Sequence, residues 1–423
     1  MNGKGERRGR LSWAMYDWAN SAHSTVILTF VFSAYLTRQV APDEIVGSQA
    51  WGLSVGISGF LVAVVAPVLG AITDQTGRRK PWILAFTTLC VLATAALWFI
   101  RPSAQYLITA AVLAGVGAMA IELAIMSYNA MLPGLAGRER TGRWSGWGWA
   151  LGYGGGLVCL ISVLLLFVED ATRLAFLDTQ AAEHLRASFV FVAAWIALFS
   201  LPLFLFTPDT AHSGKSLRRS LEDGARQLVD SLRDIRRYAN IARFLLARIF
   251  YVDGLATIFA FGGVYAAGTV GMTELDILYF AIALNVSAGI GAFAFAWIDD
   301  LIGSRRTILL ALTALVLSSS TMLLVESPAQ FTFAGLVLGF FVGPAQAASR
   351  SYLAQAAPEA LQNQMFGLFA FSGKATAFAG PLLVGWLTGV TGSQRIGMST
   401  VVVLIAAGLV IMFTVKEADE STG

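Results

Sequence analysis

The sequence predicts an all-α polytopic membrane protein whose twelve transmembrane helices form two pseudo-symmetric six-helix bundles. Of the 423 residues, 56% are hydrophobic and 13% are charged, whereas soluble domains carry about 25% charged residues. Apolar runs of 18 or more residues recur along the chain, and each is long enough to cross a ~30 Å hydrocarbon core as a helix. A short charged loop in the first half of the chain is also repeated 226 residues later.

The expected helices lie on either side of one long polar stretch, residues 208–240. We place the twelve spans at 13–38, 50–73, 81–100, 104–131, 143–168, 187–207, 241–268, 273–298, 306–325, 329–356, 363–390 and 396–415. The division predicts an N-terminal six-helix bundle over 1–207, a linker over 208–240 and a C-terminal six-helix bundle over 241–423.

Apolar residues recur at helical spacing among Arg and Asp in the linker. This pattern predicts an amphipathic helix on the inner membrane surface or, equally, a solvated linker helix. The residues that carry it are Leu217, Leu221, Leu228, Leu232 and Ile235.

The distribution of Lys and Arg predicts the orientation. With the N-terminus inside, the inner segments hold 21 of these residues and the outer segments hold five. Cytoplasmic loops carry such an excess, so we expect a multi-pass protein of the cell (inner) membrane with both termini in the cytoplasm. The net charge of +3 arises from these basic loops; we expect the lipid bilayer as a partner, no nucleic acid, and a monomer.

The repeated charged loops are "GAITDQTGRRKPWI" (70–83) and "WIDDLIGSRRTIL" (297–309). Both join two spans on the expected cytoplasmic side. In the first loop, a glycine permits a tight turn, Pro81 suits the first position of the next helix, and Asp74 suits the positive N-terminal end of that helix. The arginines would face anionic headgroups or a neighbouring helix, although a plain topology signal would also explain them.

The first loop resembles the loop signature of the major facilitator superfamily, through Gly70, Asp74, Gly77, Arg78 and Arg79. The resemblance implies the major facilitator fold and a gate that latches the two bundles in the outward-facing state. The repeat supplies the equivalent gate residues Asp300, Gly303 and Arg305 in the second half.

A finer resemblance is to the vacuole-effluxer-like branch of that superfamily. It is carried by "WAMYDWANSAHSTVILTFVF" in span one, "YVDGLATIFAFGG" (251–263) in span seven and "GPAQAASRSYLAQAAP" (343–358) in span ten. The fungal members of this branch are autophagy-associated exporters of amino acids from the vacuole. The resemblance implies transport but does not fix the substrate of this chain.

Ionisable residues at mid-bilayer cost at least ~2.5–3.5 kcal/mol on insertion scales, so each one needs a reason. Glu122, Asp253 and Lys374 each lie eleven or twelve residues from the inner end of their span, a depth of about 17 Å. Polar residues at similar or shallower depth complete the candidate substrate and proton site: Gln346, Asn285, His23 and Asn20.

These groups could hold a zwitterion, because the carboxylates would bind an ammonium while Lys374 or Arg350 would bind a carboxylate. A carboxylate away from water favours its protonated form, so Glu122 and Asp253 are the candidates for proton coupling. A structural ion pair between Lys374 and either carboxylate would explain the same residues. Asp17 and Arg350 lie nearer the inner surface, where they would act as gate residues or structural partners.

The sequence therefore predicts a secondary active transporter that moves a small polar solute, an amino acid or similar zwitterion, by alternating access. Coupling to protons is preferred, and coupling to sodium stays an alternative. Two other functions stay open: an exporter of drugs or amphipathic compounds, and a membrane receptor or scaffold that transports nothing. The sequence contains no nucleotide-binding loop and no metal-ligand spacing, so we expect no enzyme activity, no catalytic residues, no metal and no cofactor.

Overall fold

The computed structural model describes residues 3–168, 177–211, 213–214, 219–224, 226–227 and 238–418, and throughout these residues the regular elements are helices. The longer helices are α1 (Gly3–Ala22), α3 (Glu44–Thr76), α4 (Lys80–Ala96), α5 (Leu107–Asn129), α7 (Thr141–Val163), α8 (Glu183–Phe206), α10 (Ala239–Tyr265), α11 (Glu274–Ile302), α12 (Ser304–Leu324), α13 (Pro328–Ala356), α14 (Gln362–Ser372), α15 (Ala379–Thr391) and α16 (Gln394–Phe413). The shorter α-helices are α2 (Val31–Tyr35) and α6 (Leu132–Ala136); π-helical turns span His23–Phe30, Leu36–Val40, Leu164–Val168 and Ala266–Val270.

Ten helices within the described residues are long and apolar enough to cross a membrane. Each coincides with one of the expected spans, which confirms a multi-pass helical membrane protein. The count of twelve stays a prediction, because the two further expected spans, 13–38 and 363–390, are interrupted helices. The first consists of α1, a π-helical turn, α2 and a second π-helical turn; the second consists of α14 and α15, separated by turns at 373–378.

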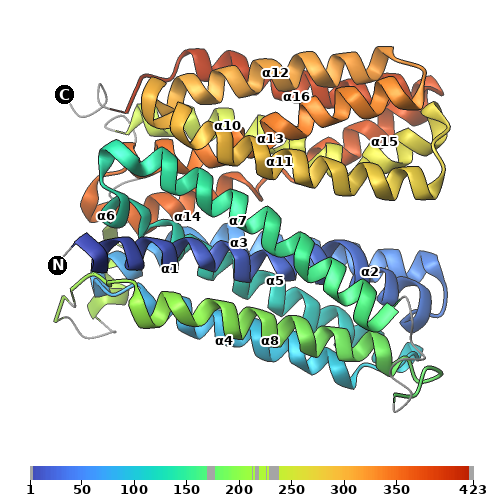
Figure 1. Ribbon diagram of the computed structural model, residues 1–423, viewed down its shortest axis with the longest axis horizontal. Helices are drawn as coiled ribbons and strands as arrows, with labels where there is room; N and C mark the ends of the chain where they lie inside the picture. Colours follow the sequence, from blue (N-terminus) through green and yellow to red (C-terminus); the bar gives the residue numbers. More distant parts are fainter. Residues whose placement is uncertain are drawn as a thin grey trace. The chain divides into compact units, whose positions relative to one another are not determined.

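The chain packs into two units (Figure 1). Unit 1 contains residues 1–65, 76–131 and 151–215, and unit 2 contains residues 66–75, 132–150 and 216–423. Helices α3 and α7 each contribute one part to unit 1 and the other to unit 2. The expected bundle boundaries at 207 and 241 stay a prediction.

In unit 1, α4 packs against both α5 and α8, and α1 packs along α8. An aromatic cluster fills its core, where the ring of Phe32 lies 5.2 Å from that of Phe189. The glycine-rich stretch 152–156 of α7 lies against α1: a Cβ on Gly155 would lie 2.3 Å from the carbonyl oxygen of Trp18. Small residues therefore allow a close helix contact here, as in many membrane helix pairs.

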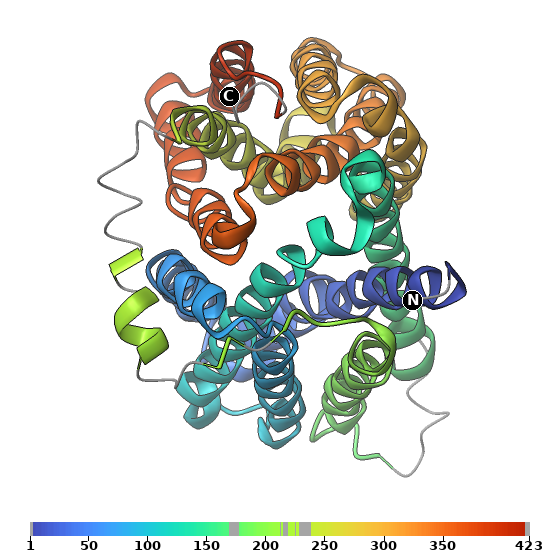
Figure 2. The same ribbon diagram turned by 90° about the vertical axis from the view of Figure 1, so that its left-hand side faces the viewer.

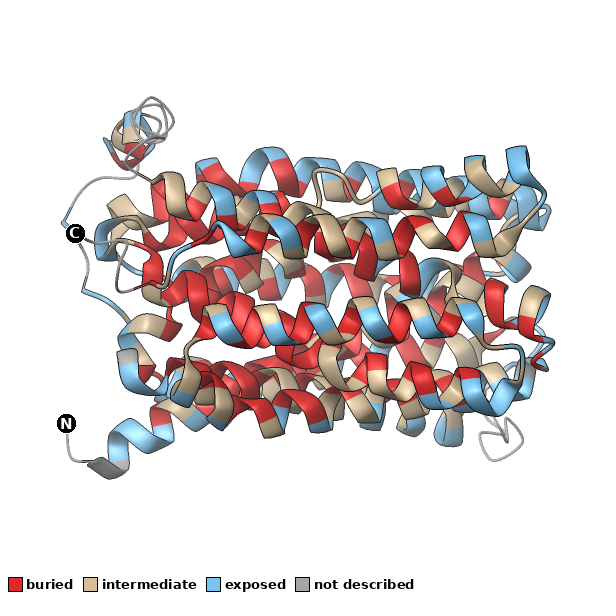
Figure 3. Ribbon diagram, turned by 90° about the horizontal axis from the view of Figure 1, so that it is seen from above, coloured by how far each residue is buried: buried red, intermediate tan, exposed pale blue. Residues whose placement is uncertain are grey.

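In unit 2, α10 packs along α16, and α13 packs against both α11 and α12. The end-on view in Figure 2 shows the helices of residues 239–413, coloured olive to red, gathered around one another. Buried and exposed residues alternate along the helices (Figure 3). The exposed faces carry large apolar side chains, such as Phe60 at 67% and Leu324 at 77% exposure. Water does not favour such faces, whereas lipid does, so they fit a membrane-embedded bundle.

The expected linker helix falls mostly outside the described residues. Of the five apolar residues that predicted it, Leu221 alone is described; it lies in a short helical stretch, and its side chain is exposed.

Candidate functional site

The charged loop at the end of α3 contacts the N-terminus of α14 within unit 2. The carboxylate of Asp74 accepts hydrogen bonds from the backbone N–H of Asn363 (3.0 Å), the side-chain amide of Asn363 (2.8 Å) and the backbone N–H of Gln364 (2.9 Å). The first backbone N–H groups of a helix lack partners inside the helix and attract negative charge. Asp74 therefore caps α14 from a distant part of the chain.

This placement corrects one expectation. We predicted that Asp74 would lie at the N-terminus of the next helix, α4, but Asp209 occupies that position. The Asp209 carboxylate accepts hydrogen bonds from the backbone N–H groups of Arg79 (3.0 Å) and Lys80 (3.2 Å). Asp74 is thereby left available to cap α14.

The second charged loop makes the equivalent contact between α11 and α7 within unit 2. The Asp300 carboxylate accepts a hydrogen bond from the backbone N–H of Arg143 (3.0 Å) and lies 3.4 Å from the Arg143 side chain. It also interacts with the backbone N–H of Gly142. Asp300 therefore caps α7 as Asp74 caps α14. Helices α3 and α14 belong to expected spans two and eleven, and α11 and α7 belong to expected spans eight and five. Span two of the first half corresponds to span eight of the second, and span five to span eleven, so the two contacts are equivalent under the internal repeat.

The two motif glycines make the turns that the sequence predicts. Gly77 has a φ of +81° and Gly303 has a φ of +90°, a region that side chains other than glycine rarely adopt. In the second loop, the Arg305 guanidinium donates to the backbone carbonyls of Phe413 and Val415 at the end of α16. In the first loop, Arg78 is exposed and Arg79 is buried.

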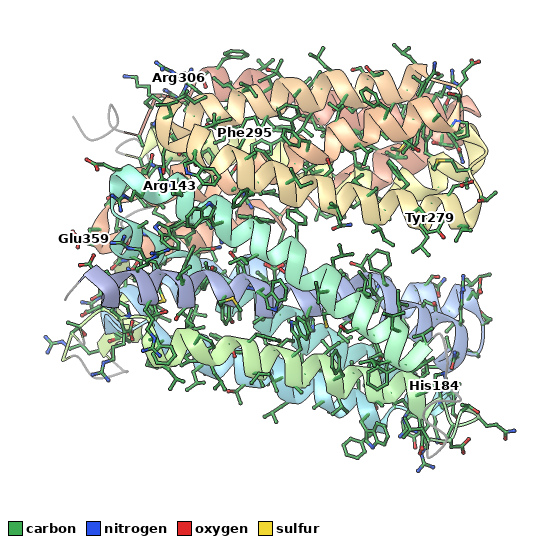
Figure 4. The ribbon with its side chains drawn as sticks, in the orientation of Figure 1. Arg143, His184, Tyr279, Phe295, Arg306 and Glu359 are labelled. Atoms are coloured by element: carbon green, nitrogen blue, oxygen red, sulfur yellow. The ribbon has the colours of Figure 1, made fainter. Side chains whose placement is uncertain are left out.

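Arg350 joins α13 to the first turns of α7, also within unit 2. Its guanidinium donates to the hydroxyl (3.0 Å) and to the backbone carbonyl (2.6 Å) of Ser145, and it lies 5.9 Å from the ring of Trp149. Figure 4 shows Arg143, Arg306 and Glu359 at one end of unit 2 and Tyr279 at the opposite end. The α7 contacts therefore lie at the end that carries the basic loops.

The interruption of span eleven lies beside α10. Arg248 of α10 donates to the carbonyl of Phe369 (2.6 Å) and to the hydroxyl of Ser372 (2.7 Å), at the C-terminal end of α14. Asp253, five residues later on α10, accepts a hydrogen bond from the backbone N–H of Gly380 (3.2 Å), at the N-terminal end of α15. The positive charge of Arg248 thus lies at the negative C-terminal end of α14, and the negative charge of Asp253 lies at the positive N-terminal end of α15. Lys374 lies in the turns between these two helices.

Asp253 retains unused hydrogen-bonding capacity. Its side chain is 4% exposed, and among the described residues its second carboxylate oxygen, Oδ1, has no hydrogen-bond partner. A carboxylate oxygen that is dry and unsatisfied in this way is costly. The interruption therefore presents an acceptor that a ligand ammonium, a cation or a proton could satisfy.

In unit 1, His23 and Glu122 come together. His23 is 1% exposed, and within the described part of the chain neither ring nitrogen has a hydrogen-bond partner. The imidazole lies against Gly117 of α5, where an added Cβ would be 2.8 Å from Nε2 of His23. Glu122, five residues after Gly117, is close enough for its charge to act on the imidazole. His23 also begins a π-helical turn, a feature that recurs at functional sites.

The remaining sequence candidates make local contacts. Asn20 donates to the carbonyl of Tyr16 (2.8 Å) and lies 3.5 Å from Asp17, which is itself buried. Asn285 donates to the carbonyl of Ala281 on its own helix (2.9 Å), and Gln346 is partly buried on α13. These contacts leave their expected substrate roles as predictions.

Two acidic residues were missed by sequence reasoning. Asp209 was assigned to a linker, and only its position beside α4 reveals its capping role. Asp299 was passed over beside its motif neighbour Asp300, yet it is 4% exposed. The consecutive "DD" was the available signal, because adjacent residues of a helix point in different directions and so call for separate explanations.

A family model described as "Vacuole effluxer Atg22 like" matches residues 46–421. An uncharacterized MFS-type transporter, YxiO of Bacillus subtilis, is 28% identical over 410 residues, which cover 96% of this chain and 94% of that protein. Autophagy-related protein 22 of Kluyveromyces lactis is 24% identical over 381 residues, which cover 82% of this chain and 74% of that protein.

Among solved structures, the proton:xylose symporter XylE of the major facilitator superfamily superposes with a TM-score of 0.76 at 12% identity, covering 99% of this chain and 97% of that one. The likeness at this identity shows the fold alone, which is the major facilitator fold expected from the sequence. The chain belongs to the vacuole effluxer Atg22-like family and is a multi-pass membrane transporter of the major facilitator type.

Proposed function

We propose that this transporter moves an amino acid or a similar zwitterion by alternating access, coupled to protons. The observation that supports the proposal is the interruption of the expected span eleven, where Asp253 of a candidate span caps α15 and Lys374 lies in the turns between α14 and α15. Half-helix ends and irregular backbone at mid-membrane depth form substrate and ion sites in other secondary transporters. An amino acid carries both charges, so it complements this arrangement better than a neutral sugar or an apolar compound does.

In the proposed bound state, the free oxygen of Asp253 accepts a hydrogen bond from the substrate ammonium. The substrate carboxylate pairs with the Lys374 ammonium or with backbone N–H groups at the start of α15. Each charge-assisted hydrogen bond is worth about 1.5–3 kcal/mol, which is a factor of about 10–150 in affinity.

We assign proton coupling to Asp253 and to Glu122 with its neighbour His23. Asp253 lies inside an apolar span, where the charge of a carboxylate is costly and a proton removes it. Glu122 and His23 lie close enough for the charge of Glu122 to act on the imidazole. In the proposed cycle, the α3–α14 and α7–α11 contacts form the inner gate on the cytoplasmic side, with both termini on the same side. The positions of the basic loops support this orientation.

The test is counterflow in proteoliposomes that contain a panel of unlabelled amino acids, with labelled leucine, tyrosine and lysine outside. Asp253→Asn retains an oxygen for the Gly380 N–H, so the fold should survive while the fixed negative charge is lost. We expect at least tenfold weaker exchange for Asp253→Asn and for Glu122→Gln, and full exchange for Asp178→Asn, which changes an exposed loop carboxylate.

Thermal melting of each variant separates a lost site from a lost fold. If the folded wild-type protein exchanges no amino acid, the proposed substrate class is wrong. Efflux of an amphipathic dye in the same vesicles would then favour the exporter function, and the absence of both would favour a receptor or scaffold.

A further inference from the structure

Asp299 lies at the end of α11, next to the gate residue Asp300, and its carboxyl is enclosed by three other helices. Gly142 at the start of α7 lies directly on it: a Cβ there would be 2.6 Å from the carboxylate oxygen Oδ2. Ser304 of α12 and Ser351 of α13 face it, but their hydroxyls hydrogen-bond to each other at 2.7 Å.

The carboxyl is buried, and no basic side chain is among the described groups that act on it. The side chain is 4% exposed, and among the described residues neither oxygen makes a hydrogen bond of good geometry. The charges that act on it, Asp300 and Glu417, are both negative.

The basic side chains that the structure describes on the surrounding elements have other partners. They are Arg143 and Arg140, which act on Asp300; Arg305, which binds carbonyls at the end of α16; Arg306, which lies 3.9 Å from Glu417; and Arg350, which binds Ser145. An ionised carboxylate in such surroundings would exchange its hydration for no more than the serine hydroxyls that face it. The closed arrangement therefore favours the neutral, protonated acid.

The internal repeat shows that the fold does not need an acid here. The 226-residue offset that relates Asp74 to Asp300 relates Thr73 to Asp299. Thr73 is fully buried, and its hydroxyl donates to the carbonyl of Leu69. A neutral residue thus serves the same position at the α3–α14 contact, so the acid at the α7–α11 contact has a role other than packing.

We propose that Asp299 is a proton-binding site of the inner gate. When α7 lies on α11, Asp299 holds a proton; when α7 moves away, water reaches the carboxyl, the O–H bond breaks and the proton passes to that water. The inference rests on the proposed function, because it takes the α7–α11 contact to open during transport.

The sign of the pH dependence follows from this linkage. The closed arrangement binds one more proton than the open one, so acid favours closure and base favours opening. For one proton, the ratio of open to closed changes by up to about tenfold per pH unit. This proton site is separate from Asp253 and Glu122, since it responds to closure of the gate without any substrate.

The test measures gate opening directly. Nitroxide labels are placed at Glu139 and Arg306, two exposed positions of unit 2 near the start of α7 and of α12, in a full-length chain whose two buried cysteines, Cys90 and Cys159, are replaced by alanine. Double electron–electron resonance then gives the distance distribution in liposomes from pH 5 to pH 8.5, with no amino acid present.

We expect the longer-distance population of the wild-type protein to rise with pH, by up to about tenfold per unit near the midpoint. Asp299→Asn and Asp299→Thr, the latter reproducing the Thr73 position, should show the short distance at every pH. Asp300→Asn, which weakens the cap on α7, should open the gate more at each pH but keep the pH response.

A pH response that persists in both Asp299 variants would overturn the proposal, and so would a wild-type distribution that does not change with pH. Because the measurement needs no substrate, it can succeed even if the chain exchanges no amino acid. Failure of the gate proposal and failure of the proposed substrate class are therefore distinguishable.

Discussion

Substituting Gly70 by alanine should hold the α3–α14 contact apart. A Cβ at this position would lie 2.3 Å from the carbonyl oxygen of Asn363 and 2.8 Å from the Cα of Gln364, both backbone atoms that cannot rotate away. Normal van der Waals contact needs about 3.5 Å, so the two helices must separate by about 1 Å. The hydrogen bonds of Asp74, now 2.8–3.0 Å long, would then exceed the usual limit.

The energetic consequence can be worked from these contacts. Overpacking costs about 1–3 kcal/mol, and loss of a charge-assisted hydrogen bond at least ~1.5 kcal/mol. A total of about 3 kcal/mol shifts the balance between closed and open gate by roughly a hundredfold. Folding itself should change little, because alanine favours helix over glycine by about 1 kcal/mol.

The assay is the distance between nitroxide labels at Val68 of α3 and Glu359, which are both exposed positions of unit 2. We expect a short distance in the parent protein and a longer one in Gly70→Ala. Gly56→Ala is the matched control, because it lies on the same helix and a Cβ there meets nothing within 4 Å. If Gly70→Ala and Gly56→Ala gave the same distribution, the close approach of α3 to α14 would not control the gate.

Three further substitutions test other parts of the account. Arg248→Ala should lower the free energy of unfolding, measured by denaturant titration, by about 3 kcal/mol. The substitution removes two charged hydrogen bonds and the cation–π contact with Phe369. An unchanged titration midpoint would show that α14 does not depend on this cap. Gly155→Ala should cost about 1–3 kcal/mol in the same titration, because its methyl group would overlap the carbonyl of Trp18, and an unaffected variant would contradict the close contact of α7 with α1. His23→Gln, which is no bulkier than histidine beside Gly117, should leave thermal melting within a few degrees, because no hydrogen bond within the described residues is lost. It should alter the pH profile of transport, and an unchanged profile would make this histidine structural.

The positions of most spans and of the turn glycines could be predicted from the sequence, because both depend on local properties. A run of about 20 apolar residues marks a span wherever it lies, and Gly77 and Gly303 adopt positive φ because their turns demand it. The partner of Asp74 could not be predicted in this way. Any helix N-terminus attracts a carboxylate, and only packing decides that α14 receives Asp74 while α4 receives Asp209.

The interruption of span eleven shows the same limit. Residues 363–390 read as one apolar span in the sequence. The helix instead breaks at 373–378, and Pro381 lies in the first turn of α15, where proline is tolerated. Arg248 and Asp253 stabilise the two helix ends from α10, five residues apart on one neighbouring helix. Their joint role depends on the packing of α10 against α14 and α15, which the spacing along the sequence does not reveal.

The most direct test of the central claim is proton movement driven by substrate. Proteoliposomes loaded with a pH-sensitive dye receive leucine, tyrosine or lysine in the absence of any other gradient. The account predicts a change of internal pH with a transported amino acid, and none with Asp253→Asn. Net uptake of labelled amino acid by the wild-type protein without any change of internal pH would contradict proton coupling.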